Sequence, residues 1–272
     1  MALETPTAIS SGSFGDAFTV EPKVRHTYTA VLLHGRGSHG QEFAEELFTT
    51  QVSDGSTLLE KLPCWKWVFP SSKELWSTAF QEEMPAWFEA HSLTDVAGHQ
   101  DLQMPSIRDS VSYLNDILNK EMAKLEGKKE KVIVFGISQG AAIGMWTLLC
   151  SKVQIGAFIG ASAWLPFAED LRCHFSQSSK NSTREKVEAA EFVRIMTEGG
   201  SRSWVDTPVF PGHGIDDAYV DVELGRQARD ALTSLGMKVE WKEYQGAEQE
   251  GHWLKEPEEI DDIFQFLSKI TK

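Results

Sequence analysis

The sequence predicts an α/β fold in which a mostly parallel central sheet is covered by helices on both faces. Apolar, β-branched strand segments alternate with segments of helical spacing along nearly the whole chain. The strand segments are apolar almost throughout, as expected where both faces of a sheet are buried. A chain of 272 residues with 41% hydrophobic composition is large enough for one extensive core. We therefore expect one domain over residues 28–272, preceded by a partly ordered arm over residues 1–27.

The predicted elements follow from these patterns. Apolar runs predict strands at residues 28–33, 65–69, 155–161, 207–210 and 238–244, and another that begins at Val132. Helical spacing predicts helices at residues 41–48, 58–62, 106–125, 185–196, 220–235 and 257–270, and another from the Gly140 region to about Ser151. Ser106 and Asp109 have the spacing of a capping box.

Two stretches lack a clear period. Residues 71–88 are dense in aromatic and apolar side chains, which either line an apolar groove or serve as core plugs. Residues 168–206 are polar, and nearly forty residues between strands is long for a compact domain. We expect an insertion there that acts as a lid or is partly disordered.

Composition narrows the class of protein. The net charge is -14 and the isoelectric point is near 5.0, which argues against binding to nucleic acid or to anionic lipid. Cys64, Cys150 and Cys173 lack metal-ligand spacing and cannot all pair, which favours free thiols in a reducing compartment. We find no signal-peptide pattern and no apolar run of about 18 residues. A cytoplasmic protein without integral membrane association is expected, and its oligomeric state stays open.

One motif organises the chain. The strand from Val132 leads into Gly136-Ile137-Ser138-Gln139-Gly140, and a helical pattern follows. A sharp strand–turn–helix connection of this type exposes a serine hydroxyl, and the glycines allow strand and helix to approach closely. Ser138 is therefore the candidate nucleophile, and the backbone N–H of Gln139 is a candidate oxyanion donor. The alternative is a glycine-rich turn that only lets a helix pack on a sheet.

A second glycine-rich loop follows the strand at residues 28–33. It reads His34-Gly35-Arg36-Gly37, and it lies where this architecture supplies a second oxyanion donor. The candidate donor is the backbone N–H of Arg36. A flexible turn with His34 packed inside is the alternative.

A serine hydroxyl needs a general base, and the base needs an acceptor that holds its tautomer. The order Ser, acid, His is expected, and His252 follows the last predicted strand. The other histidines lie before that position. Asp216 and Asp217 both follow the strand at residues 207–210, and only one of them can face the imidazole. The other would point away or cap the next helix.

Six blocks of this sequence, in order, resemble the acyl-protein thioesterases and lysophospholipase-like carboxylesterases, which have the α/β-hydrolase fold. The blocks are His34-Gly35-Arg36-Gly37, Met84-Pro85-Ala86-Trp87-Phe88, Gly136-Ile137-Ser138-Gln139-Gly140, Ser162-Ala163-Trp164-Leu165-Pro166, His213-Gly214-Ile215-Asp216-Asp217 and His252. The resemblance implies that Asp217 is the acid and that neither a metal nor an organic cofactor takes part. It implies cleavage of thioesters or carboxylic esters of acyl chains. It also implies an acyl site that includes Leu75, Trp76, Phe80, Trp87 and Trp164.

The chain departs from the family pattern in places. Arg36 stands where the family usually has Leu, and Ser38 where it usually has Asp. The Arg36 guanidinium either holds an acidic group of the substrate or points to solvent. The sequence thus predicts a serine hydrolase that forms an acyl-enzyme. The alternatives are a lactone hydrolase or acyl-transferring cyclase with the same triad, and a catalytically silent binding protein.

Overall fold

The computed structural model describes residues 12–92, 95–96, 98–176, 184–198 and 202–271. Its centre is a seven-stranded sheet in the order β1-β3-β2-β6-β7-β8-β9. Every neighbouring pair is parallel except β1 and β3. The strands are β1 (Phe18–Val20), β2 (Tyr28–Leu33), β3 (Trp65–Phe69), β6 (Val132–Ile137), β7 (Ala157–Ala161), β8 (Val209–Gly214) and β9 (Lys242–Tyr244). The predicted mostly parallel sheet is confirmed.

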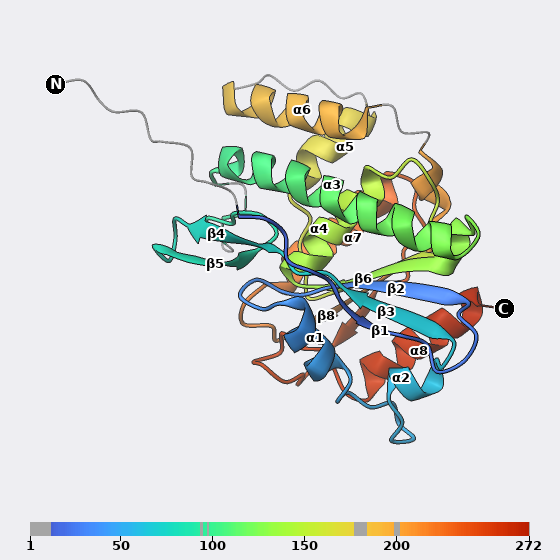
Figure 1. Ribbon diagram of the computed structural model, residues 1–272. Helices are drawn as coiled ribbons and strands as arrows, with labels where there is room; N and C mark the ends of the chain where they lie inside the picture. The colour runs from blue at the N-terminus through green and yellow to red at the C-terminus, as the bar shows by residue number, and fades with distance from the viewer. Residues whose placement is uncertain (1–11, 93–94, 97, 177–183, 199–201, 272) are drawn as a thin grey trace.

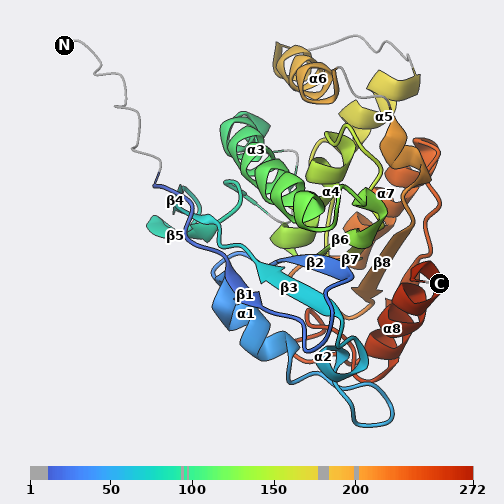
Figure 2. The same cartoon turned by 45° about the vertical axis from the view of Figure 1, so that its right-hand side comes forward.

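Helices cover both faces of this sheet (Figure 1). One face carries α3 (Gln100–Lys124), α4 (Gln139–Leu149), α5 (Ala168–Ser176), α6 (Arg184–Thr197) and α7 (Val222–Ser234). The other carries α1 (Gly40–Leu47), α2 (Leu58–Lys61) and α8 (Glu258–Ile270), as the turned view in Figure 2 also shows. Each face has its own apolar core. The central strands β2, β6 and β7 are buried almost throughout because apolar side chains are needed on both of their faces.

The structure differs from the sequence prediction in two segments, residues 1–27 and residues 71–88. Part of the predicted arm forms β1, which pairs with β3 at the edge of the sheet. Within residues 71–88, β4 (Lys73–Ser77) and β5 (Glu82–Ala86) form an antiparallel hairpin that projects beside the sheet (Figure 1). Their apolar residues do not alternate regularly, because the hairpin is only half covered by the rest of the molecule.

Three element boundaries also differ. Helix α3 begins at Gln100 and continues through Pro105, so the capping box predicted at Ser106 is wrong. The added turn includes Gln103, which is buried, so packing extends the helix past the local signal. Strand β8 extends to Gly214 because it pairs first with β7 and then with β9. Strand β9 begins at Lys242, and only an isolated bridge at Val239 precedes it.

The segment at residues 168–206 contains α5, α6 and a 3₁₀ turn, η2 (Ser203–Asp206). Part of it, at residues 177–183 and 199–201, lies outside the described residues. Phe192 and Val193 of α6 are buried in the core on the α3 side, where α6 forms an outer layer (Figure 2). The predicted helix at residues 185–196 is confirmed, and a lid function of this segment stays a prediction. Within the described residues, no helix is long and apolar enough to cross a membrane.

A buried carboxyl group joins α8 to β8. Glu259 is 3% exposed, and its Oε2 accepts a hydrogen bond from the Lys255 N–H at 2.9 Å. A Cβ on Gly212 would lie 2.1 Å from Glu259 Oε1, so this position of β8 accommodates only glycine. Burial, with a smaller contribution from the nearby Asp262, raises the pKa of Glu259 to about 8 although the Lys255 N–H lowers it.

We predict that Glu259→Gln removes a pH dependence of stability. The folded protein holds a proton on Glu259 between the ordinary carboxyl pKa and about 8, whereas the unfolded chain has released it. The free energy of unfolding therefore falls as pH rises through this window, by up to about 1.4 kcal/mol per pH unit. Urea unfolding of both proteins at pH 5 and pH 7.5 measures this fall. An equal fall in the variant would contradict the assignment.

Candidate active site

Ser138 lies at the turn between β6 and α4 with backbone angles φ 54° and ψ −126°. A positive φ is uncommon for a residue other than glycine and requires support from the surrounding structure. The Ser138 N–H provides part of this support by donating to the Ala161 carbonyl at 2.8 Å. Ser138 is partly exposed while its neighbours Ile137 and Gln139 are buried, so the turn presents the serine outward.

The turn is held against the end of β2. A Cβ on Gly140 would lie 2.1 Å from the Leu33 carbonyl oxygen and 2.5 Å from that of His34. Only glycine allows α4 to begin so close to the neighbouring strand. The loop after β2 consequently lies beside the nucleophile turn, and a Cβ on Gly35 would lie 3.5 Å from the Ser138 Cβ.

His34 fixes the start of this loop. Its Nε2 accepts a hydrogen bond from the Ser72 N–H at 3.0 Å, so its Nδ1 carries the proton and donates to the Gly35 carbonyl at 2.7 Å. Burial lowers the pKa of His34 to about 4, so the ring is neutral. His34 is thus packed inside, as one interpretation of His34-Gly35-Arg36-Gly37 predicts, and the loop lies beside the serine, whereas the oxyanion role of Arg36 stays a prediction.

Two backbone N–H groups beside Ser138 are available to a ligand. Gln139 is the first residue of α4, so its N–H has no acceptor within the helix. The N–H of Arg36 makes no hydrogen bond with any other group in the described part of the chain. These are the two oxyanion donors expected from the sequence.

His252 and Asp217 are in direct hydrogen-bond contact. His252 Nδ1 lies 2.8 Å from Asp217 Oδ2, so Nδ1–H donates to the carboxylate and Nε2 is left as the basic nitrogen. The Asp217 side chain is fully buried, whereas that of His252 is 15% exposed. The Nδ1 side of the imidazole therefore contacts a buried carboxylate, while part of the His252 side chain is exposed at the surface.

The choice between the two adjacent aspartates is resolved by their partners. Asp217 Oδ1 accepts hydrogen bonds from the N–H groups of Tyr219 and Val220, each at 2.9 Å, and its Oδ2 faces His252. Asp216 instead accepts from the Gly246 N–H at 2.9 Å. The alternative that the second aspartate caps the next helix is wrong, because Asp221 is the N-cap of α7.

A second imidazole supports Asp217. His213 Nε2 lies 3.4 Å from Asp217 Oδ2 and 2.8 Å from the Val220 carbonyl oxygen, and its side chain is fully buried. Burial opposes ionisation of Asp217, but the hydrogen bonds from His213 and His252 lower the pKa of the carboxyl well below its ordinary value. Asp217 is therefore ionised at neutral pH.

The sequence does not point to His213, because only the histidine after the last predicted strand has the position expected of the general base. The signal that could have found it is its position four residues before Asp217, at the end of a strand. Its other nitrogen, Nδ1, is buried without a hydrogen-bond partner in the described residues. It lies against Gly225 of α7, where a Cβ would be 2.3 Å away.

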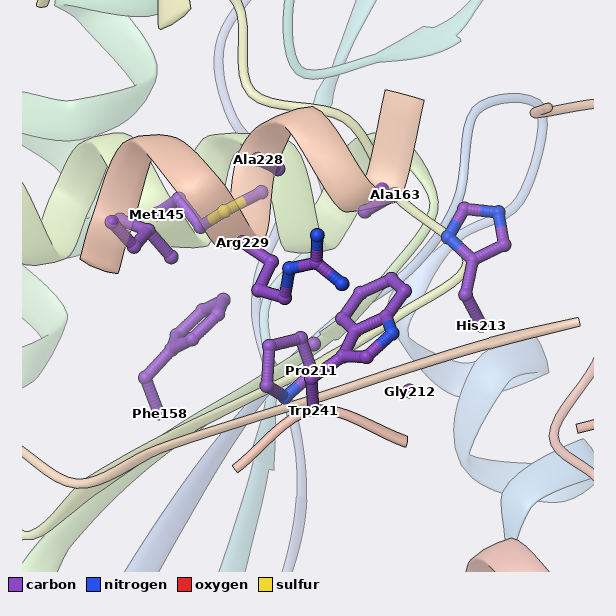
Figure 3. A pocket seen from close by; sticks show the side chains of 12 residues that line it. Met145, Phe158, Ala163, Pro211, Gly212, His213, Ala228, Arg229 and Trp241 are labelled. Atoms are coloured by element: carbon purple, nitrogen blue, oxygen red, sulfur yellow. The ribbon is translucent and has the colours of Figure 1, made fainter. Parts of the chain in front are cut away.

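Figure 3 shows the cavity under α7 that His213 borders. The cavity is small, and its walls include Met145, Phe158 and Trp241. The Arg229 guanidinium lies 5.5 Å from the Trp241 ring centre. This cavity therefore lies between β8 and α7, next to His213. Ser138 is not among the residues that line it.

Ser138, Asp217 and His252 follow β6, β8 and β9, whose carboxyl ends lie along one edge of the sheet. The structure brings Asp217 and His252 into direct contact. The Ser138 hydroxyl makes no hydrogen bond within 3.5 Å to any described residue. Contacts of this kind often tighten only when a substrate binds. Within the described residues, no cluster of His, Cys, Asp and Glu side chains could hold a metal ion.

The Gln139 side chain forms hydrogen bonds with the backbone of Trp87 and Phe88. Its Oε1 accepts from the Trp87 N–H at 2.8 Å, and its Nε2 donates to the Phe88 carbonyl at 2.7 Å. The Ser110 hydroxyl in turn donates to the Trp87 carbonyl at 2.7 Å. The segment around Trp87 and Phe88 is thus fixed directly beside the candidate nucleophile.

The expected acyl-site residues take different positions. Leu75 and Trp76 line a recess beside Arg36, and Phe80 lies 5.0 Å from the Arg36 guanidinium. Trp164 is buried and packs edge-on against Phe88 at 6.0 Å between ring centres. Trp87 is buried in the core, where its indole N–H donates to the His34 carbonyl at 2.9 Å, and it does not line the recess.

Comparisons with known proteins show which proteins this chain resembles. A family model described as phospholipase/carboxylesterase matches residues 14–186. The acyl-protein thioesterase 1 of Yarrowia lipolytica is 26% identical over 259 residues, covering 94% of this chain and 97% of that protein. The acyl-protein thioesterase 1 of Neurospora crassa is 27% identical over 248 residues, covering 90% and 87%.

Solved structures share the fold. The crystal structure of Zea mays acyl-protein thioesterase 2 matches with a TM-score of 0.68 and 24% identity, covering 95% of this chain and 100% of that one. The structure of Arabidopsis thaliana SOBER1 matches with a TM-score of 0.66 and 23% identity. Asp217 and His252 lie beyond the residues that the family model matches, so their pairing is an observation independent of it.

The two adjacent aspartates give a matched pair of variants. We predict that Asp217→Asn lowers kcat for ester hydrolysis by about 10⁴-fold, because an amide cannot hold His252 in the required tautomer. Asp216→Asn should change kcat by less than about threefold, because the amide oxygen still accepts from the Gly246 N–H. The kcat values of both variants on a 4-nitrophenyl ester measure this. Equal effects of the two substitutions would contradict the assignment.

Proposed function

Because the chain belongs to the phospholipase/carboxylesterase family, we propose that it is a serine hydrolase with the triad Ser138, His252 and Asp217, acting on acyl esters or thioesters. The observation that carries the triad is the 2.8 Å contact of His252 Nδ1 with the buried Asp217 carboxylate. This contact leaves Nε2 free at the sheet edge where Ser138 is exposed. The names of the relatives, acyl-protein thioesterases, favour acyl thioesters among the substrates.

In the first half-reaction the Ser138 hydroxyl attacks the acyl carbonyl carbon while His252 Nε2 takes its proton. The carbonyl π electrons move onto oxygen and form a tetrahedral oxyanion. This intermediate collapses by breaking the bond to the leaving alcohol or thiol, which receives the proton from His252. Ser138 is left as an acyl ester.

In the second half-reaction water attacks the acyl-enzyme, and His252 takes a proton from the water. Collapse of the second oxyanion releases the carboxylic acid and returns the proton to the Ser138 oxygen. Asp217, which stays ionised, stabilises the imidazolium formed in both steps. His213 is a positioning residue here, because it touches Asp217 and not the reacting atoms.

The oxyanion is bound by the N–H groups of Arg36 and Gln139. Both lie beside the Ser138 turn, and the N-terminus of α4 adds a partial positive charge there. A preformed donor of this kind typically contributes 10²-fold to 10³-fold to kcat. The close contact of Gly140 with the end of β2 supports this proposal, because it holds the loop that carries Arg36 beside the start of α4.

We predict that Ser138→Ala lowers kcat on 4-nitrophenyl butyrate and on an acyl thioester by on the order of 10⁵-fold or more, while leaving the melting temperature near that of the wild type. The measurement is steady-state hydrolysis together with thermal unfolding. Retained activity in a folded variant would overturn the proposed nucleophile.

Covalent labelling provides an independent check. A fluorophosphonate should add its mass to the peptide that carries Ser138. The internal control is Ser162, which follows the neighbouring strand β7 and also has a positive φ of 49° but is buried. Label on Ser162 in place of Ser138 would contradict the proposal, and absence of label would favour a catalytically silent protein.

A further inference from the structure

The Arg36 side chain lines a shallow recess beside the nucleophile turn, called the Arg36 recess below. Its apolar walls are Leu75 and Trp76 of β4, Met84 of β5 and Phe88. Apart from Arg36 itself, the one charged side chain on its walls is that of Glu89. The recess thus combines an apolar lining with a single cation and a single anion.

Two segments that form the recess also contact the nucleophile turn. Gln139, the residue after Ser138, holds the backbone of Trp87 and Phe88 through both ends of its side chain. Gly35, the residue before Arg36, lies against the Ser138 side chain. The recess therefore lies next to the turn that carries Ser138.

The Arg36 guanidinium has few partners. Its Nη1 donates to the Ala90 carbonyl at 3.2 Å, and its carbon lies 5.0 Å from the Phe80 ring centre. No carboxylate of the described residues lies within 4.0 Å of its nitrogens, although a guanidinium has five N–H donors. Partial burial lowers the pKa of Arg36, which records the cost of desolvating this cation.

Glu89 does not neutralise Arg36. Its Oε1 accepts from the Thr78 N–H at 2.9 Å, which holds the carboxylate toward the hairpin. A partly desolvated cation without an ionic partner favours a ligand that brings a negative charge. The cation–π contact with Phe80 orients the guanidinium but supplies no such charge.

We propose that the Arg36 recess binds a carboxylate at the far end of the substrate's acyl group, so that the enzyme prefers acyl chains with a terminal acid. The proposal rests on the proposed hydrolase function. Arg36 then has two roles, an oxyanion donor through its backbone and a specificity determinant through its side chain.

The recess favours a carboxylate over a phosphate. A guanidinium can bind either a carboxylate or a phosphate through two parallel N–H groups, so the charge of the ligand decides between them. A phosphate monoester carries close to two negative charges at neutral pH, and Glu89 on the same walls would repel it more strongly. The apolar walls accommodate the methylene groups between the reacting carbonyl and the acid.

Matched esters test the proposal. The 4-nitrophenyl monoester of suberic acid carries a free terminal carboxylate, and its methyl-capped form is neutral with the same chain and leaving group. The measured quantity is the ratio of their kcat/KM values, corrected for spontaneous hydrolysis. We expect the wild type to favour the free acid by roughly tenfold or more, as for a hydrogen bond to a charged group. This ratio should fall as salt is added.

Two substitutions should move the ratio in opposite directions. Arg36→Leu removes the cation and should bring the ratio to about one or below. Glu89→Gln removes the competing anion and should raise it. Because each ratio compares two substrates in one protein, any general loss of activity or stability cancels. An unchanged ratio in Arg36→Leu, or a wild type that favours the capped ester, would overturn the proposal.

A binding measurement separates this proposal from the proposed function. Suberate monomethyl ester should bind to Ser138→Ala in calorimetry and fail to bind when Arg36→Leu is added. Failure to hydrolyse either ester, with this binding intact, would count against the hydrolase function only. Hydrolysis of both esters without binding or preference would overturn the Arg36 proposal alone.

Discussion

The close contact between the first turn of α4 and the end of β2 determines the geometry of the whole site. Gly140 lies against the carbonyl oxygens of Leu33 and His34, so no side chain fits between the start of α4 and the end of β2. That contact supports the positive φ of Ser138 and places the Arg36 loop beside it. The candidate nucleophile, both candidate oxyanion donors and one wall of the Arg36 recess all depend on this approach.

The acid and base are organised by a different principle, which is burial of one charge among several donors. Asp217 is fully buried, and its carboxylate is satisfied by two backbone N–H groups and two imidazoles. Hydrogen bonding outweighs desolvation there, so the carboxylate remains charged where an isolated one would not. Glu259 shows the opposite balance, because one backbone N–H does not compensate its burial. The two carboxyl groups differ in protonation because they differ in hydrogen-bond donors.

The sequence predicted what local chemistry determines. The apolar strand, the glycines and the serine specify the nucleophile turn within thirteen residues, and the chain order of acid and base locates His252. The sequence alone does not show which of Asp216 and Asp217 faces the imidazole. Their orientations depend on contacts with the N–H of Gly246 and with the N–H of Val220, just before α7. The resemblance to a family was needed to favour Asp217.

What the sequence did not reveal depends on contacts between distant segments. Strand β8 runs through Pro211 and Gly212 because β7 lies alongside it, and this extension brings His213 to Asp217. The hairpin of β4 and β5 was hidden because its alternation of apolar and polar residues is irregular. The unpaired state of Arg36 likewise becomes visible only when Glu89 is seen to be held by Thr78.

The two outermost strands have a consequence for behaviour at high concentration. Strands β1 and β9 span three residues each, and β9 carries Lys242 and Glu243, which are both exposed. Short, charged edge strands offer few free backbone groups for a neighbouring chain to extend, which disfavours edge-to-edge aggregation. The long strands that place the reactive groups lie inside the sheet. The end of the sheet that carries Ser138 and His252 is therefore partly exposed to solvent, while the two edge strands disfavour fibril-like growth.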